Sequence, residues 1–178
     1  MKKIFAVLVI FALTSCIGAG VNSKIEQSQK GFFPQLIGID LEGNKRQIPQ
    51  AFDNKINLVA VAFKREQQQN VDGWIKVADE IMAKNEEVSF YELPVIYELG
   101  AVSRSFINNG MRRGVPDAKA RKRTITVYTN RDEFFKMMKM SEDKIYLLVI
   151  SNQGKIMQRI EGDATKRNIS ALKKKWYF

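Results

Sequence analysis

Hydrophobic positions along the chain follow two periods, and the two periods alternate. Continuous apolar runs rich in β-branched residues occur at 56–63 and 145–150, and such runs are typical of strands covered on both faces of a sheet. Between them, apolar residues recur at helical spacing across 71–82 with charged residues on the other side. This spacing predicts an amphipathic helix.

The other segments extend the same order and predict the fold class. Strands that alternate with helices, and that end in a hairpin and a helix, indicate an α/β fold with a mixed central sheet, helices on both faces and an N-terminal β-hairpin. In the first half of the chain, the pattern further predicts a hairpin over 36–49, a strand at 88–93 closed by Pro94, and a helix from Ile96 through Leu99, Val102 and Phe106 to Ile107. In the second half, it predicts a strand at 124–129, a helix at 131–140 capped by Asn130, a strand at 155–160 after a turn at 151–154, and a final helix capped by Thr165.

The start of the chain has the pattern of a lipoprotein signal peptide. Lys2 and Lys3 precede an uninterrupted apolar run at 4–13, which is too short to span a bilayer because a crossing helix needs about 20 apolar residues. The run ends at Leu13-Thr14-Ser15-Cys16, which resembles the bacterial lipobox. We expect cleavage before Cys16 and diacylglycerol on its thiol; an ordinary secretory signal with a chance cysteine is the alternative.

This signal sets the expected organisation and location of the chain. Residues 1–15 would form the signal peptide, residues 16–31 a flexible tether from lipidated Cys16, and residues 32–178 one folded domain. Each buried acyl methylene contributes about 0.8 kcal/mol, so two or three chains make attachment effectively permanent. The expected location is the bacterial cell envelope, with the protein anchored in the membrane and facing the periplasm or the cell exterior.

Composition removes several kinds of chemistry. The 178 residues include no histidine and one cysteine, which excludes Ser/His/Asp and Cys/His catalytic pairs, zinc sites that use histidine, and an internal disulfide. We therefore expect no catalytic residue, no metal site and no cofactor. The formal charge of +10 favours acidic partners, but nucleic acid is not expected as a partner after export.

The order of elements resembles the thioredoxin-like fold, in particular its peroxiredoxin-type branch with an added N-terminal hairpin. Residues 33–38, followed by Leu41-Glu42-Gly43, look like the first segment of those domains, and this likeness covers about residues 32–178. A narrower likeness over 109–172 is to the mitochondrial ATP synthase assembly factor family and its bacterial lipoprotein relatives, which implies a role in assembling membrane protein complexes. Its motifs are Gly110-Met111-Arg112-Arg113 and residues 146–150, 154–156 and 161–165.

The resemblance also shows what this chain lacks. Thioredoxin-like enzymes carry a reactive thiol in the turn after the first central strand, where a helix N-terminus stabilises the thiolate. The corresponding residues 64–69 contain no cysteine, and residues 140–144 contain no counterpart of the cis-proline that those enzymes place before the strand at 145–150. The resemblance therefore implies a binding or assembly module without thiol redox activity.

The same turn is one of two candidate binding sites. Lys64, Arg65, Glu66 and Gln67 precede a helix, and free N–H groups at a helix N-terminus attract anions, so the turn could hold an anion or other ligand. A solvated loop explains the same residues. The alternative function is a peroxiredoxin-like or other enzyme with thiol-free chemistry rebuilt in residues 64–69.

The second candidate site is a run of basic residues. Seven positive residues and one acid, Asp117, lie within 104–123. The pattern predicts a loop between Gly110 and Thr124, because this segment contains Gly114 and a proline and has no apolar periodicity. We expect the loop to bind an acidic protein surface or anionic lipid; the alternative is a solvated basic loop. The arginines selected for this role are Arg112, Arg113, Arg121 and Arg123.

Overall fold

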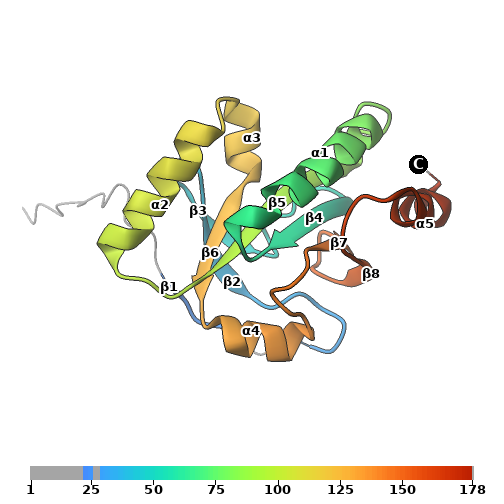
Figure 1. The fold of residues 1–178 in the computed structure, drawn as a ribbon. Coiled ribbons are helices and arrows are strands. Elements are labelled where there is room, and N and C mark those ends of the chain that lie inside the picture. The colour runs from blue at the N-terminus through green and yellow to red at the C-terminus, as the bar shows by residue number, and fades with distance from the viewer. Residues whose placement is uncertain (1–21, 26–28, 178) are drawn as a thin grey trace, which may run out of the picture.

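An eight-stranded mixed sheet runs through the centre of the molecule (Figure 1). The computed structural model describes residues 22–25 and 29–177. The strands lie in the order β3-β2-β6-β5-β4-β7-β8, and β1 pairs with β6. Their bounds are β1 (Asn22–Ser23), β2 (Leu36–Asp40), β3 (Lys45–Ile48), β4 (Ile56–Ala62), β5 (Val88–Tyr97), β6 (Ile125–Thr129), β7 (Tyr146–Ile150) and β8 (Ile156–Glu161).

The two continuous apolar runs form neighbouring strands in the middle of this sheet. Strand β4 pairs in parallel with β5 and antiparallel with β7. All five residues of β7 and six of the seven residues of β4 are buried. The prediction of strands covered on both faces is confirmed, because only an interior strand hides alternate side chains on both sides.

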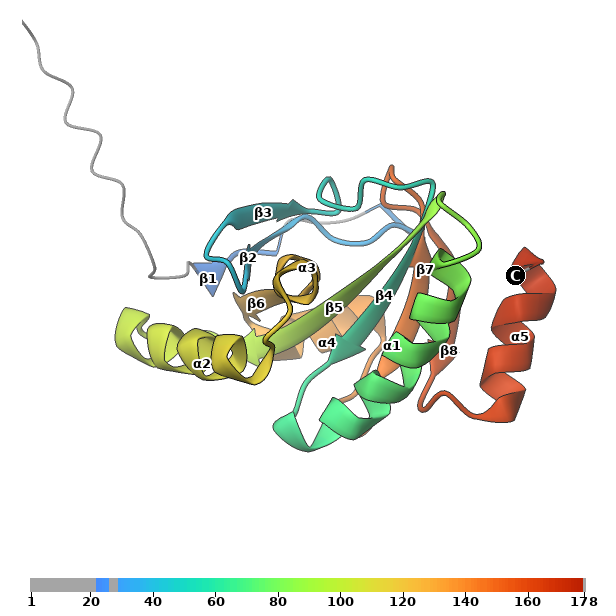
Figure 2. The same cartoon turned by 90° about the horizontal axis from the view of Figure 1, so that it is seen from above.

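Helices cover both faces of the sheet (Figure 2). On one face, Trp74 of α1 and Leu172 of α5 belong to a core that includes Leu58 and Leu147 of the sheet. On the other face, Phe134 of α4 packs in a second core. The helices are η1 (Arg65–Gln67, a 3-10 helix), α1 (Gln68–Met82), α2 (Ala101–Gly114), α3 (Ala118–Arg123), α4 (Arg131–Met138) and α5 (Lys166–Trp176).

Strand β5 is longer than the sequence predicted. It continues through Pro94 to Tyr97, because it changes partner at the proline: the ladder with β4 ends at the pair Ala62 and Pro94, and the ladder with β6 begins at Val95. Ile96 consequently belongs to a strand, and the helix that follows begins only at Ala101. The prediction that Pro94 closes the strand is wrong.

The predicted loop between Gly110 and Thr124 is also wrong, because most of it is helical. Helix α2 runs to Gly114, and α3 occupies Ala118–Arg123. The carboxylate of Asp117 caps α3 by accepting the N–H of Ala120 at 2.7 Å, which satisfies one of the free donors at a helix start. Apolar spacing predicted a helix only as far as Ile107, and it could not reveal α3, because α3 has no buried residue.

The folded part of the chain begins earlier than residue 32. Asn22–Ser23 forms a parallel pair with Tyr128 and Thr129 of β6. Ser23 is buried, its Oγ accepts the N–H of Ile37 at 2.7 Å and its carbonyl accepts the hydroxyl of Thr129 at 2.7 Å. The expected tether of residues 16–31 therefore contains a strand. The predicted signal peptide and Cys16 lie outside the described residues.

Candidate functional site

The turn after β4 is closed by one buried side chain. The amide oxygen of Gln67 accepts the N–H groups of Phe63 at 2.8 Å and Lys64 at 3.1 Å, and its nitrogen donates to the carbonyl of Glu142 at 2.8 Å. Two of the backbone donors in this turn are thus already bonded to Gln67. Gln67 joins the turn to the segment that precedes β7.

Charges in the same turn are paired across this junction. Nζ of Lys64 lies 3.1 Å from the Glu142 carboxylate, and Nη2 of Arg131 lies 2.7 Å from its other oxygen. The Lys64 hydrogen bond is the main cause that lowers the pKa of Glu142. The structure therefore brings Lys64 and Gln67 into one bonded cluster, whereas Arg65 and Glu66 are exposed.

Arg131 is the member of this cluster that sequence reasoning missed. It is 5% exposed and its guanidinium lies 4.2 Å from the ring centroid of Tyr97 and 5.1 Å from that of Phe135. Stacking on aromatic faces and the Glu142 ion pair compensate a buried charge. A basic residue at the first position of α4 gave no signal, because its burial depends on Tyr97 and Glu142, which lie outside α4.

The second candidate site, the basic segment, lies on α2 and α3. Arg112 donates to the carbonyl of Leu41 and to the Glu42 carboxylate, both at 3.2 Å. Arg121 also donates to Glu42 and to the carbonyl of Val115. The hydrogen bond from Arg121 is the main cause that lowers the pKa of Glu42. These two arginines join α2 and α3 to the β2–β3 turn.

The other two selected arginines differ from each other. Arg123 lies 3.4 Å from the carboxylate of Asp79 on α1, so it ties α3 to the neighbouring helix. Arg113 is exposed, and its side chain makes no hydrogen bond or ion pair with any residue in the described parts of the chain. Of the four, Arg113 is the one whose charge is left for a partner.

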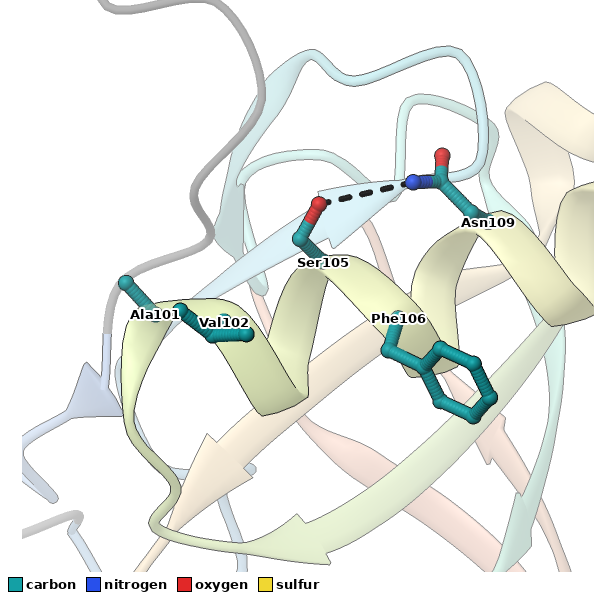
Figure 3. A pocket seen from close by; sticks show the side chains of 5 residues that line it. All are labelled: Ala101, Val102, Ser105, Phe106 and Asn109. Carbon is teal, nitrogen blue, oxygen red and sulfur yellow. Dashed lines mark hydrogen bonds between the residues drawn. The ribbon is translucent and has the colours of Figure 1, made fainter.

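Apolar side chains extend this basic surface along α2. Val102 is 85% exposed and Phe106 is 81% exposed, although both are among the apolar positions from which the sequence predicted this helix. Figure 3 shows that the pocket at this place is lined from α2 alone. We call the exposed side chains of α2 and α3 the α2–α3 surface. The residues that line the pocket are Ala101, Val102, Ser105, Phe106 and Asn109.

The described residues offer little for a metal ion. Within 22–25 and 29–177, no three or more acidic or cysteine side chains gather into a group that could hold one. A buried carboxyl does occur on β5: Glu92 is 7% exposed and accepts the hydroxyl of Thr124 at 3.3 Å. Burial raises the pKa of Glu92. In the same part of the chain, no helix has the length and apolar character to cross a membrane.

Comparisons with known proteins agree with this architecture. The family model described as ATP10 protein matches residues 20–176, while no curated protein sequence matches. Among solved structures, the thioredoxin domain of a thiol-disulfide oxidoreductase from Bacteroides vulgatus is 15% identical, with a TM-score of 0.52 and coverage of 85% of this chain and 99% of that one. Copper-bound yeast Sco1 is 9% identical, with a TM-score of 0.55 and coverage of 84% and 95%.

A thiol peroxidase from Chromobacterium violaceum is 10% identical, with a TM-score of 0.52 and coverage of 85% of this chain and 88% of that one. Identities this low establish the fold and nothing more about function. The thioredoxin-like fold that the sequence predicted is confirmed, and so is the resemblance to the assembly factor family.

Proposed function

Because this chain belongs to the ATP10 protein family, we propose that it is an assembly module of the bacterial cell envelope, anchored through lipidated Cys16 and without thiol redox activity. Residues 17–178 contain no cysteine, so the folded part has no sulfur nucleophile for disulfide or peroxide chemistry. In place of a reactive thiol, the turn after β4 holds the bonded side chains of Lys64 and Gln67.

The observation that carries the proposal is the exposure of α2. This helix has 14 residues and no buried side chain, whereas α1 and α5 each bury side chains in a core. A helix that keeps two large apolar side chains, Val102 and Phe106, exposed to water is a feature of an interaction surface. The basic residues beside it favour an acidic protein surface or anionic lipid as the partner.

The anchor is tested by replacing one atom. In Cys16→Ser the thiol that accepts diacylglycerol becomes a hydroxyl, so processing stops and the variant incorporates no fatty acid. Metabolic labelling with an alkyne fatty acid, followed by mass spectrometry of the N-terminal peptide, measures this directly. Fatty acid found on the Cys16→Ser variant would contradict the anchor and leave the assembly role to be tested by itself.

The assembly role is tested in cells that lack this protein. We expect less of at least one membrane protein complex on native gels of the membrane fraction, and recovery when the parent chain is restored. Phe106→Ser combined with Arg113→Glu should restore less of that complex than the parent does, whereas Lys174→Glu on α5 should restore all of it. Equal recovery of the complex by both variants would show that assembly does not depend on the α2–α3 surface.

Absence of redox activity has its own test. The chain from Cys16 onward with Cys16→Ala should reduce neither insulin disulfides nor peroxide in the presence of a thiol reductant. Turnover above a heat-treated sample would support the alternative, an enzyme with rebuilt chemistry in residues 64–69.

A further inference from the structure

Four exposed side chains form one stripe along α2. Val102, Phe106, Asn109 and Arg113 are separated by four, three and four residues, and this spacing places them on the same side of a helix. All four are exposed. The stripe covers 11 residue steps, which is about 17 Å at the rise of an α-helix.

The stripe faces away from the sheet. The opposite side of α2 contacts β6, where Asn108 accepts the hydroxyl of Tyr128 at 2.8 Å and Met111 lies 4.0 Å from the hydroxyl of Thr126. Positions 104, 108 and 111 point to the sheet, and positions 102, 106 and 113 lie about half a turn away from them. The apolar end and the cationic end of the stripe are therefore both open to the surroundings.

The chain joins the folded domain beside the apolar end of this stripe. Oδ1 of Asn22 accepts the N–H of Leu99 at 3.2 Å and Nη1 of Arg104 at 3.1 Å. These contacts fix the start of β1 against the first turn of α2. Cys16 precedes Asn22 by six residues, and a chain of six residues reaches at most about 20 Å even when fully extended.

We propose that α2 lies on the surface of an anionic bilayer, with Val102 and Phe106 among the lipid headgroups and Arg113 on their phosphates. This inference rests on the proposed anchor at Cys16, which brings the bilayer within about 20 Å of α2. An exposed aromatic residue next to cations on one helical stripe is the pattern of an interfacial helix. Lys119 and Lys122 of α3 add exposed positive charge at the same end.

The shape of the surface favours a bilayer over a peptide partner. All five residues that line the pocket of Figure 3 belong to α2, so the apolar patch is the outer side of one helix. A helical peptide needs an apolar groove between elements, and this patch does not provide one. Helix α5 lies at the other end of the domain (Figure 1) and also carries lysines. Its apolar residues Ile169, Leu172 and Trp176, however, pack against the core.

The test attaches the chain covalently to vesicles, so that its outcome does not depend on whether cells lipidate Cys16. Both cores lie between Ile25 and Trp176, so a chain that begins at Cys16 contains the whole fold. Its single thiol is coupled to a maleimide lipid in vesicles of phosphatidylethanolamine and phosphatidylglycerol. Phe106→Trp then places a tryptophan reporter on the stripe. Tyr177 is also highly exposed, and Tyr177→Trp places a matched reporter at the opposite end of the domain.

Brominated lipids in the same vesicles quench tryptophan that reaches the headgroup and acyl boundary. After subtraction of the parent emission from Trp74 and Trp176, we expect the tryptophan at position 106 to shift to the blue and to lose most of its emission. The tryptophan at position 177 should keep its emission. A reporter at position 106 that stays unquenched overturns the proposal and leaves the stripe available to a protein partner.

A second arm tests the cations. Combining Phe106→Trp with Arg113→Gln, Lys119→Gln and Lys122→Gln should reduce the quenching, and so should replacement of phosphatidylglycerol by phosphatidylcholine. Combining Phe106→Trp with Lys174→Gln should leave it unchanged. Equal quenching on zwitterionic vesicles would overturn the requirement for an anionic bilayer. Failure of Cys16 labelling in cells would overturn the anchor without changing any of these vesicle results.

Discussion

Nζ of Lys64 lies 3.1 Å from the carboxylate of Glu142 and so joins the turn after β4 to the segment before β7. Enzymes of this fold bring a thiol and a cis-proline together from these two segments. Here an ion pair and the buried amide of Gln67 occupy the junction, and the buried guanidinium of Arg131 contacts the same carboxylate. In this protein, the turn that carries the thiol in those enzymes is held by side-chain contacts to the segment before β7.

Removal of the shared carboxylate should destabilise the fold. Glu142→Ala leaves the buried Arg131 without its anionic partner, and a buried polar group that loses its partner destabilises the fold. Asp143→Ala is the matched control, because that side chain is 81% exposed and lies 3.9 Å from Lys64; its effect should stay within about 0.5 kcal/mol. Urea unfolding measures both. Equal effects would contradict a structural role for Glu142.

The ion pair of Lys64 with Glu142 makes the stability of the fold depend on pH, and the sign of this dependence follows from the pKa of Glu142. The pKa of Glu142 in the folded chain is lowered from 4.5, chiefly by the hydrogen bond from Lys64, so folding favours the ionised form. Its stabilising effect is complete above pH 4.5 and is lost as the pH falls through the lowered pKa. The stability difference between the parent and Glu142→Gln should therefore shrink from pH 7 to pH 3 in thermal melts.

Glu92 should show the opposite sign. Burial raises its pKa from 4.5, so the folded chain binds this proton more tightly than the unfolded chain, and stability falls as the pH rises from 4.5 through the raised pKa. Glu92→Gln removes the buried charge and should stabilise the protein at pH 7 by about 1 kcal/mol, or roughly 2–4 °C in Tm. At pH 4 the two proteins should melt together. A lower Tm for the variant at pH 7 would show that the ionised carboxyl is structurally required.

Replacement of Arg121 and replacement of Arg113 should have different effects on the stability of the fold. Arg121 is mostly buried and bonds Glu42 and two backbone carbonyls, so Arg121→Gln should cost about 1–2 kcal/mol. Arg113→Gln should change stability by less than about 0.5 kcal/mol. Calorimetry of the two single variants tests this difference. A combined replacement of all four selected arginines would mix the two effects.

Gly38 and Gly110 offer a pair of alanine substitutions with opposite expected effects. A Cβ at Gly38 of β2 would lie 2.4 Å from Cγ2 of Ile125, so Gly38→Ala forces strands apart and should cost about 1–3 kcal/mol. A Cβ at Gly110 of α2 meets no atom within 4 Å, and Gly110→Ala should stabilise by about 0.5–1 kcal/mol because alanine favours the helix. Chemical unfolding of both variants measures the signs.

Patterns that depend on neighbouring residues predicted much of the fold. The interior strands β4 and β7 were visible as apolar runs. Asn130 and Thr165 were visible as helix caps, and each side chain accepts the N–H three residues ahead, at 3.1 Å and 3.2 Å. The thioredoxin-like order of strands and helices could be predicted for the same reason, since the periods of buried faces are local properties of a chain.

The errors fall where the partner of a residue is distant. Pro94 looked like a strand end, but β5 passes from β4 to β6 at that residue, and no local signal records a change of neighbour. Helix α3 follows a proline and buries no side chain, so periodicity was silent there. Strand β1 exists only because Ser23 pairs with Thr129, more than a hundred residues away.

For the candidate sites, the sequence by itself determined which groups are present: no thiol after Cys16, no histidine, and a cluster of arginines. Only the tertiary structure decided which of those charges are neutralised, because ion pairs such as that of Arg121 with Glu42 join segments far apart in the chain. It also decided that Phe106 faces outward, since an apolar residue at helical spacing is buried only where another element covers it.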